Sequence, residues 1–205
     1  MKDKYLILTA RIISLLFAPF YFPVIAFIFM FAFTFLNMFP LKFKLAILVY
    51  IYLFTIAFPL LAIYLYRRLN GWTRHQSSYR SRRIVPYILS IVSYGCCLYM
   101  LWSFHMPRFT LGIIVASLTI QIICAIINQW IKISVHSAAA GGVVGAIIAF
   151  SLWFNFDPTW WLCLTILLAG AVASSRIILR VHDLKEVSVG LLVGFICGLV
   201  CVLYV

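Results

Sequence analysis

Long runs of apolar residues, separated by short polar stretches, follow one another along the whole chain. A transmembrane helix needs about 20 mostly apolar residues, and seven runs approach or exceed that length. The runs are apolar all round rather than alternating with a two-residue period, so they predict helices and not the strands of a membrane barrel. The predicted spans are residues 5–36, 44–66, 84–104, 109–131, 137–154, 159–173 and 187–205.

The connections between these runs are short, apart from residues 67–83, so we predict a single all-α, polytopic transmembrane helix bundle. Within it, residues 1–43 form an extra N-terminal membrane segment, and residues 44–205 form a domain of six core helices. Pro19 and Pro23 interrupt the first run, which leaves a kinked span and a partly re-entrant helix as alternatives.

The composition also indicates a membrane protein, because only 10% of the 205 residues are charged, against about a quarter in soluble domains. If each run crosses the bilayer, one face carries most of the basic residues. The other face carries only Lys42, Lys44 and Arg108. Positive charge favours the cytoplasm, so this distribution predicts a cytoplasmic basic face. The six arginines of residues 67–83 also suit anionic lipid headgroups, and we expect no nucleic acid partner.

Two polar clusters at the edges of the predicted spans contain the candidate chemistry. Ionisable residues at such positions are costly and mark functional sites, and the chain has only four acidic residues and four histidines. The alternation of spans puts both clusters at the same membrane face. The clusters are Lys132, Ser134 and His136, and Arg176, His182 and Glu186.

These residue types match what the handling of phosphate requires. Arg176 can hold phosphate oxygens through two parallel hydrogen bonds, and Lys132 adds a point charge. Ser134 is placed to cap the following helix, whose backbone N–H groups would then face an anion. On a helix, His182 and Glu186 would share a face. The carboxylate would then hold one ring nitrogen protonated and leave the other to attack phosphorus.

Several of these residues also fit purely structural roles. His182 and Glu186 also fit an ion pair that caps a span, and Asp183 is the alternative partner of His182 if this stretch is a loop. His136 alone fits a packed or interfacial histidine. Glycines near the C-terminus recur at four-residue spacing and predict close helix packing rather than chemistry. They are Gly190, Gly194 and Gly198.

The two clusters resemble motifs of the type-2 phosphatidic acid phosphatase superfamily, whose helical bundle is shared with vanadium haloperoxidases. Its second motif reads Pro-Ser-Gly-His, and residues 133–136 match it at the serine and the histidine. Its third motif reads Ser-Arg, five residues, His, three residues, Asp. The stretch from Ser175 to Glu186 reproduces that spacing, with Glu in place of Asp. A subgroup carries Lys-Ile-Ser-x-His, which residues 132–136 also match, and the resemblance covers about residues 129–194.

The resemblance implies a phosphatase-like domain over residues 44–205 and a two-step hydrolysis that needs neither metal nor cofactor. His182 would form a phosphohistidine, His136 would protonate the departing oxygen, and Glu186 would orient His182. Fixed cations would stabilise the phosphoryl oxygens. The family's first motif, Lys, six residues, Arg-Pro, is not found before the second. The expected phosphate-binding residues are Lys132, Ser134 and Arg176, with Arg82 and Arg83 as further candidates for the arginine of the first motif.

We therefore expect an integral membrane phosphatase that acts on a lipid phosphate or pyrophosphate monoester. Its substrate would be an anionic phospholipid or a polyprenyl phosphate, drawn from the lipids of the plasma (inner) membrane. The membrane face that carries the site has two alternatives, because the charge distribution indicates the cytoplasmic side and the resemblance implies the outer side. The alternative function is a non-enzymatic transporter or anionic-lipid-binding protein that holds a headgroup with the same cations.

Overall fold

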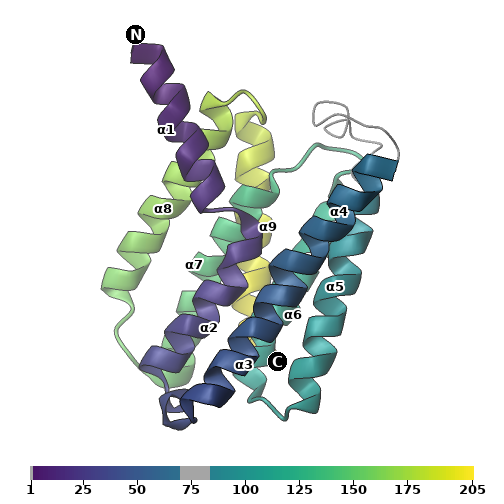
Figure 1. Cartoon of the computed structure of the whole chain (residues 1–205). Helices are drawn as coiled ribbons and strands as arrows, with labels where there is room; N and C mark the ends of the chain where they lie inside the picture. Colours follow the sequence, from purple (N-terminus) through teal and green to yellow (C-terminus); the bar gives the residue numbers. More distant parts are fainter. Residues whose placement is uncertain (1, 70–83) are drawn as a thin grey trace.

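A computed structural model describes residues 2–69 and 84–205, and every regular element in this part of the chain is a helix (Figure 1). Large apolar side chains face outward along the bundle, such as Leu152 and Leu167, and a surface of this kind is unstable in water. The chain is therefore an all-α, multi-pass integral membrane protein, as its apolar runs predict. Among the residues that the structure describes, seven helical segments are long and apolar enough to cross a bilayer: Lys4–Phe33, Leu41–Leu69, Val85–Ser103, Arg108–Ile127, Val135–Phe154, Thr159–Ile178 and Leu184–Tyr204.

The first span is broken into two helices by its prolines. Helix α1 (Lys2–Leu16) is followed by the short 3₁₀ turn η1 (Pro19–Tyr21) and by α2 (Phe22–Phe33). Ala18 has extended backbone angles (φ −68°, ψ 141°), because the ring of the following proline disfavours the helical region. In Figure 1, α2 continues toward the end of the bundle opposite the N-terminus, so α1 and α2 together run along the bundle with a kink between them.

The second span runs antiparallel to α2 and lies beside it. After the turn η2 (Phe35–Met38), α3 (Leu41–Tyr52) and α4 (Phe58–Leu69) form one long helix through the π-helical turn η3 (Leu53–Ala57). Pro59 follows this turn, and a proline cannot donate the regular helical hydrogen bond to the residue four positions earlier. Helices α5 (Ile84–Ser103) and α6 (Arg108–Ile127) then form an antiparallel pair.

The last three spans place the polar clusters. They are α7 (Val135–Phe154), α8 (Thr159–Ile178) and α9 (Leu184–Tyr204), and α7 packs closely along α9. A Cβ atom on Gly194 would overlap the carbonyl of Ala138, so only glycine permits this approach. The close packing predicted from the glycine spacing is confirmed. It holds the starts of α7 and α9 together, where the backbone N–H of Ser134 donates to the carbonyl of Glu186 (3.4 Å).

The two clusters lie at the same end of the bundle, which we call the histidine end. In Figure 1 the N-terminus, the connection from α6 to α7 and the connection from α8 to α9 all lie at the top. Helix α8 runs to Ile178, five residues beyond the predicted limit of 173, so Arg176 lies in its last helical turn. The opposite end contains residues 34–40, 104–107 and 155–158.

Candidate functional site

A tight turn after α8 brings His182 to the start of α9. Arg180 adopts a left-handed conformation (φ 52°), and the N–H of Val181 donates back to the carbonyl of Arg176 (3.2 Å). This is the hydrogen-bond pattern that commonly ends a helix and reverses the chain. The turn therefore returns the chain toward the bundle directly before His182.

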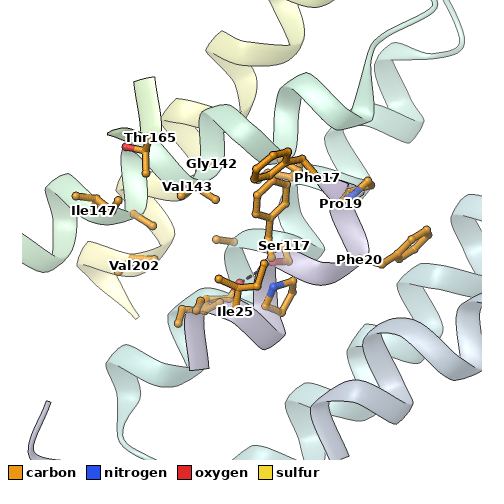
Figure 2. A pocket seen from close by; sticks show the side chains of 18 of the residues that line it. Phe17, Pro19, Phe20, Ile25, Ser117, Gly142, Val143, Ile147, Thr165 and Val202 are labelled. Atoms are coloured by element: carbon orange, nitrogen blue, oxygen red, sulfur yellow. Dashed lines mark hydrogen bonds between the residues drawn. The ribbon is translucent and has the colours of Figure 1, made fainter. Parts of the chain in front are cut away.

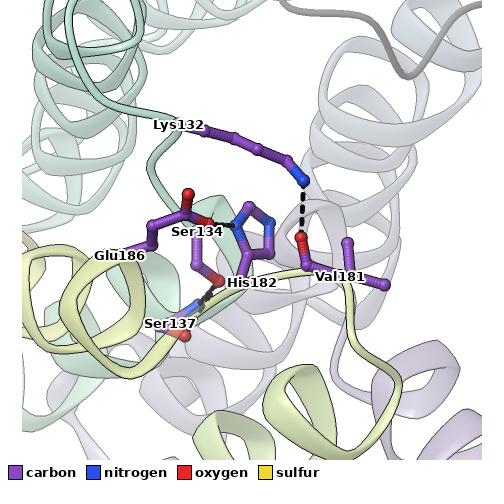
Figure 3. A network of polar contacts seen from close by, with 6 residues as sticks. All are labelled: Lys132, Ser134, Ser137, Val181, His182 and Glu186. Atoms are coloured by element: carbon purple, nitrogen blue, oxygen red, sulfur yellow. Dashed lines mark hydrogen bonds and ion pairs between the residues drawn. The ribbon is translucent and has the colours of Figure 1, made fainter.

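His182 and Glu186 form a short hydrogen bond, with 2.6 Å between Nδ1 and Oε2 (Figure 3). The expected contact is present, although the two residues do not lie on one helix, the condition from which it was argued. Helix α9 begins at Leu184, so His182 belongs to the preceding loop and Glu186 to the first helical turn. Asp183, the alternative partner, is the N-cap residue of α9 and is exposed.

Burial makes the neutral form of His182 favourable. Only 7% of the residue is exposed, and this desolvation lowers the pKa of its imidazole below the ordinary value of 6.5. The positive charges of Arg176 and Lys132 act in the same direction, while the carboxylate of Glu186 opposes them. A neutral ring that donates from Nδ1 to Glu186 keeps its lone pair on Nε2, which is the protonation state that a nucleophilic histidine needs.

The connection before α7 is tied to the connection before α9. Nζ of Lys132 donates to the carbonyl of Val181 (2.6 Å), directly before His182 (Figure 3). Ser134 caps α7 as predicted, since its Oγ accepts from the backbone N–H of Ser137 (3.4 Å). It also shares a hydrogen bond with the Ser137 hydroxyl (2.9 Å).

Ser134 is fully buried, and its hydroxyl is engaged by this cap. A direct contact with phosphate would require that hydrogen bond to break. The N–H groups in the first turn of α7 are the donors that this end of the helix offers to an anion. Phosphate binding by the Ser134 side chain therefore stays a prediction, and the capping role carries the clearer structural support.

Arg176 meets the N-terminal segment at Ser14. His136, in the first turn of α7, lies within electrostatic reach of Arg176 and His182. Nη1 of Arg176 donates to the Ser14 hydroxyl (2.7 Å), and Ser14 is buried. Sequence reasoning did not identify Ser14, because a lone hydroxyl in an apolar run resembles any serine that bonds its own helix.

A cavity of about 1080 Å³ opens at this cluster. His136, Arg176 and His182 contribute to its wall at the histidine end, and apolar side chains of α2, α6, α7 and α8 line most of the remainder (Figure 2). The predicted residues from the two sequence clusters therefore either line this cavity or form hydrogen bonds within the connections beside it. Arg82 and Arg83, the other predicted phosphate ligands, lie outside the described residues.

The chain matches no protein-family model, curated protein or solved structure. The chemistry of the site therefore has to be inferred from its residues. A neutral imidazole held by a carboxylate, a second imidazole and a guanidinium border one cavity near the end of the spans. Such a set can bind a phosphoryl group and transfer it to nitrogen.

Proposed function

We propose that the protein is a membrane-embedded phosphatase, similar to the type-2 phosphatidic acid phosphatase superfamily, that hydrolyses a lipid phosphate or pyrophosphate monoester. The 2.6 Å hydrogen bond between His182 and Glu186, at a cavity that His136 and Arg176 also line, carries this proposal. An anionic phospholipid or a polyprenyl phosphate is the substrate class that suits a basic headgroup site at the edge of apolar spans.

The reaction proceeds in two displacements at phosphorus. Nε2 of His182 attacks, a P–N bond forms, and the P–O bond to the lipid breaks while His136 gives a proton to the departing oxygen. Water then attacks the phosphohistidine and loses a proton to His136, and the P–N bond breaks to release inorganic phosphate. The two steps together return His182 and His136 to their starting protonation states.

The fixed cations stabilise the phosphoryl oxygens during both steps. Arg176 is pre-oriented by Ser14, and Lys132 lies beside the carbonyl that precedes His182. Fixed charges of this kind need no reorganisation as negative charge develops, which makes them effective in a site shielded from water. Arg82 and Arg83 remain proposed additional ligands from the connection between α4 and α5.

A phosphate-release assay on lipid phosphates, with purified protein in detergent, tests the proposal. His182→Ala is expected to abolish release, and vanadate, which mimics pentavalent phosphorus, should inhibit competitively. His105→Asn is the matched control, because His105 is exposed at the opposite end and asparagine tolerates its positive φ of 53°. Specific lipid binding without turnover of any lipid phosphate would support a transporter or lipid-binding protein instead.

We place the protein in the plasma (inner) membrane, and its orientation can be read from two engineered cysteines in a background without the native ones. Leu69 lies at the histidine end and Met38 at the opposite end, and both are exposed (86% and 88%). The charge distribution predicts that an impermeant reagent labels Met38→Cys, and not Leu69→Cys, in intact cells. The reverse pattern would put the site on the outer face, as the family resemblance implies.

A further inference from the structure

The cavity extends far beyond the polar cluster. The α7 residues that line it recur at helical spacing, from His136 past Val143 and Ile147 to Phe154 (Figure 2 labels the middle pair). From His136 to Phe154 the helix rises about 27 Å, at about 1.5 Å per residue. The hydrocarbon core of a bilayer is about 30 Å thick, so the cavity is deeper than one leaflet.

The wall away from the histidine end is suited to hydrocarbon. Two of its hydroxyl groups are bound within their own helices. Ser117 donates to the carbonyl of Ile113 (2.9 Å), and Thr165 donates to the carbonyl of Trp161 (2.8 Å). Among the lining residues of the described chain, the charged side chain is Arg176, which lies with the two histidines at the other end. This distribution matches an amphiphile with an anionic head and a long apolar tail.

The N-terminal segment supplies one side of this cavity. Phe17, Pro19 and Phe20 line it at the kink between α1 and α2 (Figure 2). Farther along α2, the rings of Phe29 and Phe33 lie edge-on to Trp161 of α8, with centroids 5.2 and 5.8 Å apart. Aromatic contacts therefore link α2 to α8 beside the far part of the cavity.

We propose that this cavity holds the hydrocarbon chain of the substrate, with the N-terminal segment as its wall, so that the site favours esters whose chain passes the bilayer midplane. The inference rests on the proposed function, because the ester bond must lie at His182. A chain confined to one leaflet leaves the far half of the cavity unfilled, whereas a longer chain makes packing contacts along its whole depth.

Chain-length selectivity of two variants tests this inference. Ile147 lines the cavity about 16 Å along α7 from His136. Leu152 is on the same helix but faces outward (67% exposed), so Ile147→Trp and Leu152→Trp add the same volume at two different places. The measured quantity is the ratio of kcat/KM for octadecyl phosphate to kcat/KM for hexyl phosphate, in detergent micelles.

We expect Ile147→Trp to lower this ratio about tenfold or more, since a filled cavity excludes the long chain, and Leu152→Trp to leave it unchanged. An unchanged ratio in Ile147→Trp, or an equal fall in both variants, would overturn the inference. If the wild-type protein hydrolyses neither these esters nor any other lipid phosphate, the proposed function fails, and the cavity is then tested by binding alone.

That binding test uses octadecyl phosphate with a photoactivatable diazirine at the end of its chain. His182→Ala protein keeps the ester intact during the experiment. The inference predicts cross-links to lining residues in the far half, such as Phe150 and Phe154, that excess octadecyl phosphate suppresses. Cross-links confined to outward-facing residues such as Leu152 would show that the chain lies in the bilayer, whether or not the protein is an enzyme.

Discussion

Oε2 of Glu186 lies 2.6 Å from Nδ1 of His182, across the start of α9. This contact fixes which ring nitrogen carries the proton, because Nδ1 donates to the carboxylate and Nε2 keeps the lone pair. Burial lowers the pKa of His182 and Glu186 opposes that shift, so the carboxylate both orients the ring and makes its nitrogen more basic. Its removal should alter the rate and the pH dependence together.

Glu186→Gln is expected to lower kcat by roughly 10²- to 10⁴-fold. Because the pKa of His182 lies below 6.5 in the folded protein, kcat/KM of the wild type should rise with pH to a midpoint below 6.5. Glu186 raises that pKa, so the substitution should move the midpoint to still lower pH. The pH profiles of both proteins are measured with the same substrate. The titration of the substrate phosphate is then equal in both profiles, and the remaining difference is the shift of His182. A midpoint that moves upward or does not move would contradict the assigned partnership.

His136→Ala should slow the first displacement in a way that depends on the leaving group. An alkyl ester releases a strongly basic oxygen that needs a proton, so turnover should fall by roughly 10²- to 10⁴-fold. An aryl phosphate with an acidic phenol as leaving group needs little protonation and should lose much less activity. The comparison is made by kcat/KM on both esters. Equal losses would assign His136 to binding or folding rather than to acid catalysis.

Ser14→Ala removes the hydroxyl that accepts from Arg176. A hydrogen bond to a charged group contributes about 1.5–3 kcal/mol, so we expect kcat/KM to fall by about tenfold or more. Ser14→Thr keeps the hydroxyl and should restore most of the activity. Thr9→Ala, at an exposed position of the same helix, serves as the control. Full activity in Ser14→Ala would mean that the N-terminal segment does not position the site.

Gly194→Ala tests whether the approach of α7 to α9 holds the two clusters together. The added methyl group would overlap the carbonyl of Ala138, which should cost about 1–3 kcal/mol of unfolding free energy and also reduce turnover. Gly170→Ala on α8 is the control, because no described atom lies within 4 Å of the new Cβ. The unfolding free energy of both variants is measured in detergent. Equal stability of the two proteins would contradict the role of Gly194.

The helices could be predicted from the sequence because a span needs a long apolar run. In this chain few polar residues interrupt those runs. The glycine spacing on α9 also correctly predicted close packing, since small residues at four-residue intervals share a helix face. The end of α8 was placed too early because Ser175 and Arg176 are polar, although they continue the helix. Polarity marks where a span leaves the apolar core, and a helix can extend beyond that point.

The site was predicted in part, and its gaps have physical reasons. The spacing of His182 and Glu186 pointed to their contact on the condition of a shared helix, but the contact forms between a loop and the first turn of α9, because a loop that enters a helix can bring the same two positions together. Ser14 and the cavity depend on how the N-terminal segment packs on α7 and α8, and contacts between residues so distant along the chain leave no local pattern.

Trapping the phosphorylated protein tests the proposed mechanism most directly. Protein mixed briefly with a radiolabelled lipid phosphate is quenched in alkali, where phosphohistidine survives, and the labelled residue is located by mass spectrometry. We predict a phosphoryl group on His182, formed and lost fast enough to account for turnover and missing in His182→Ala. Phosphate release without any phosphorylated histidine, or continued release by His182→Ala, would contradict the mechanism.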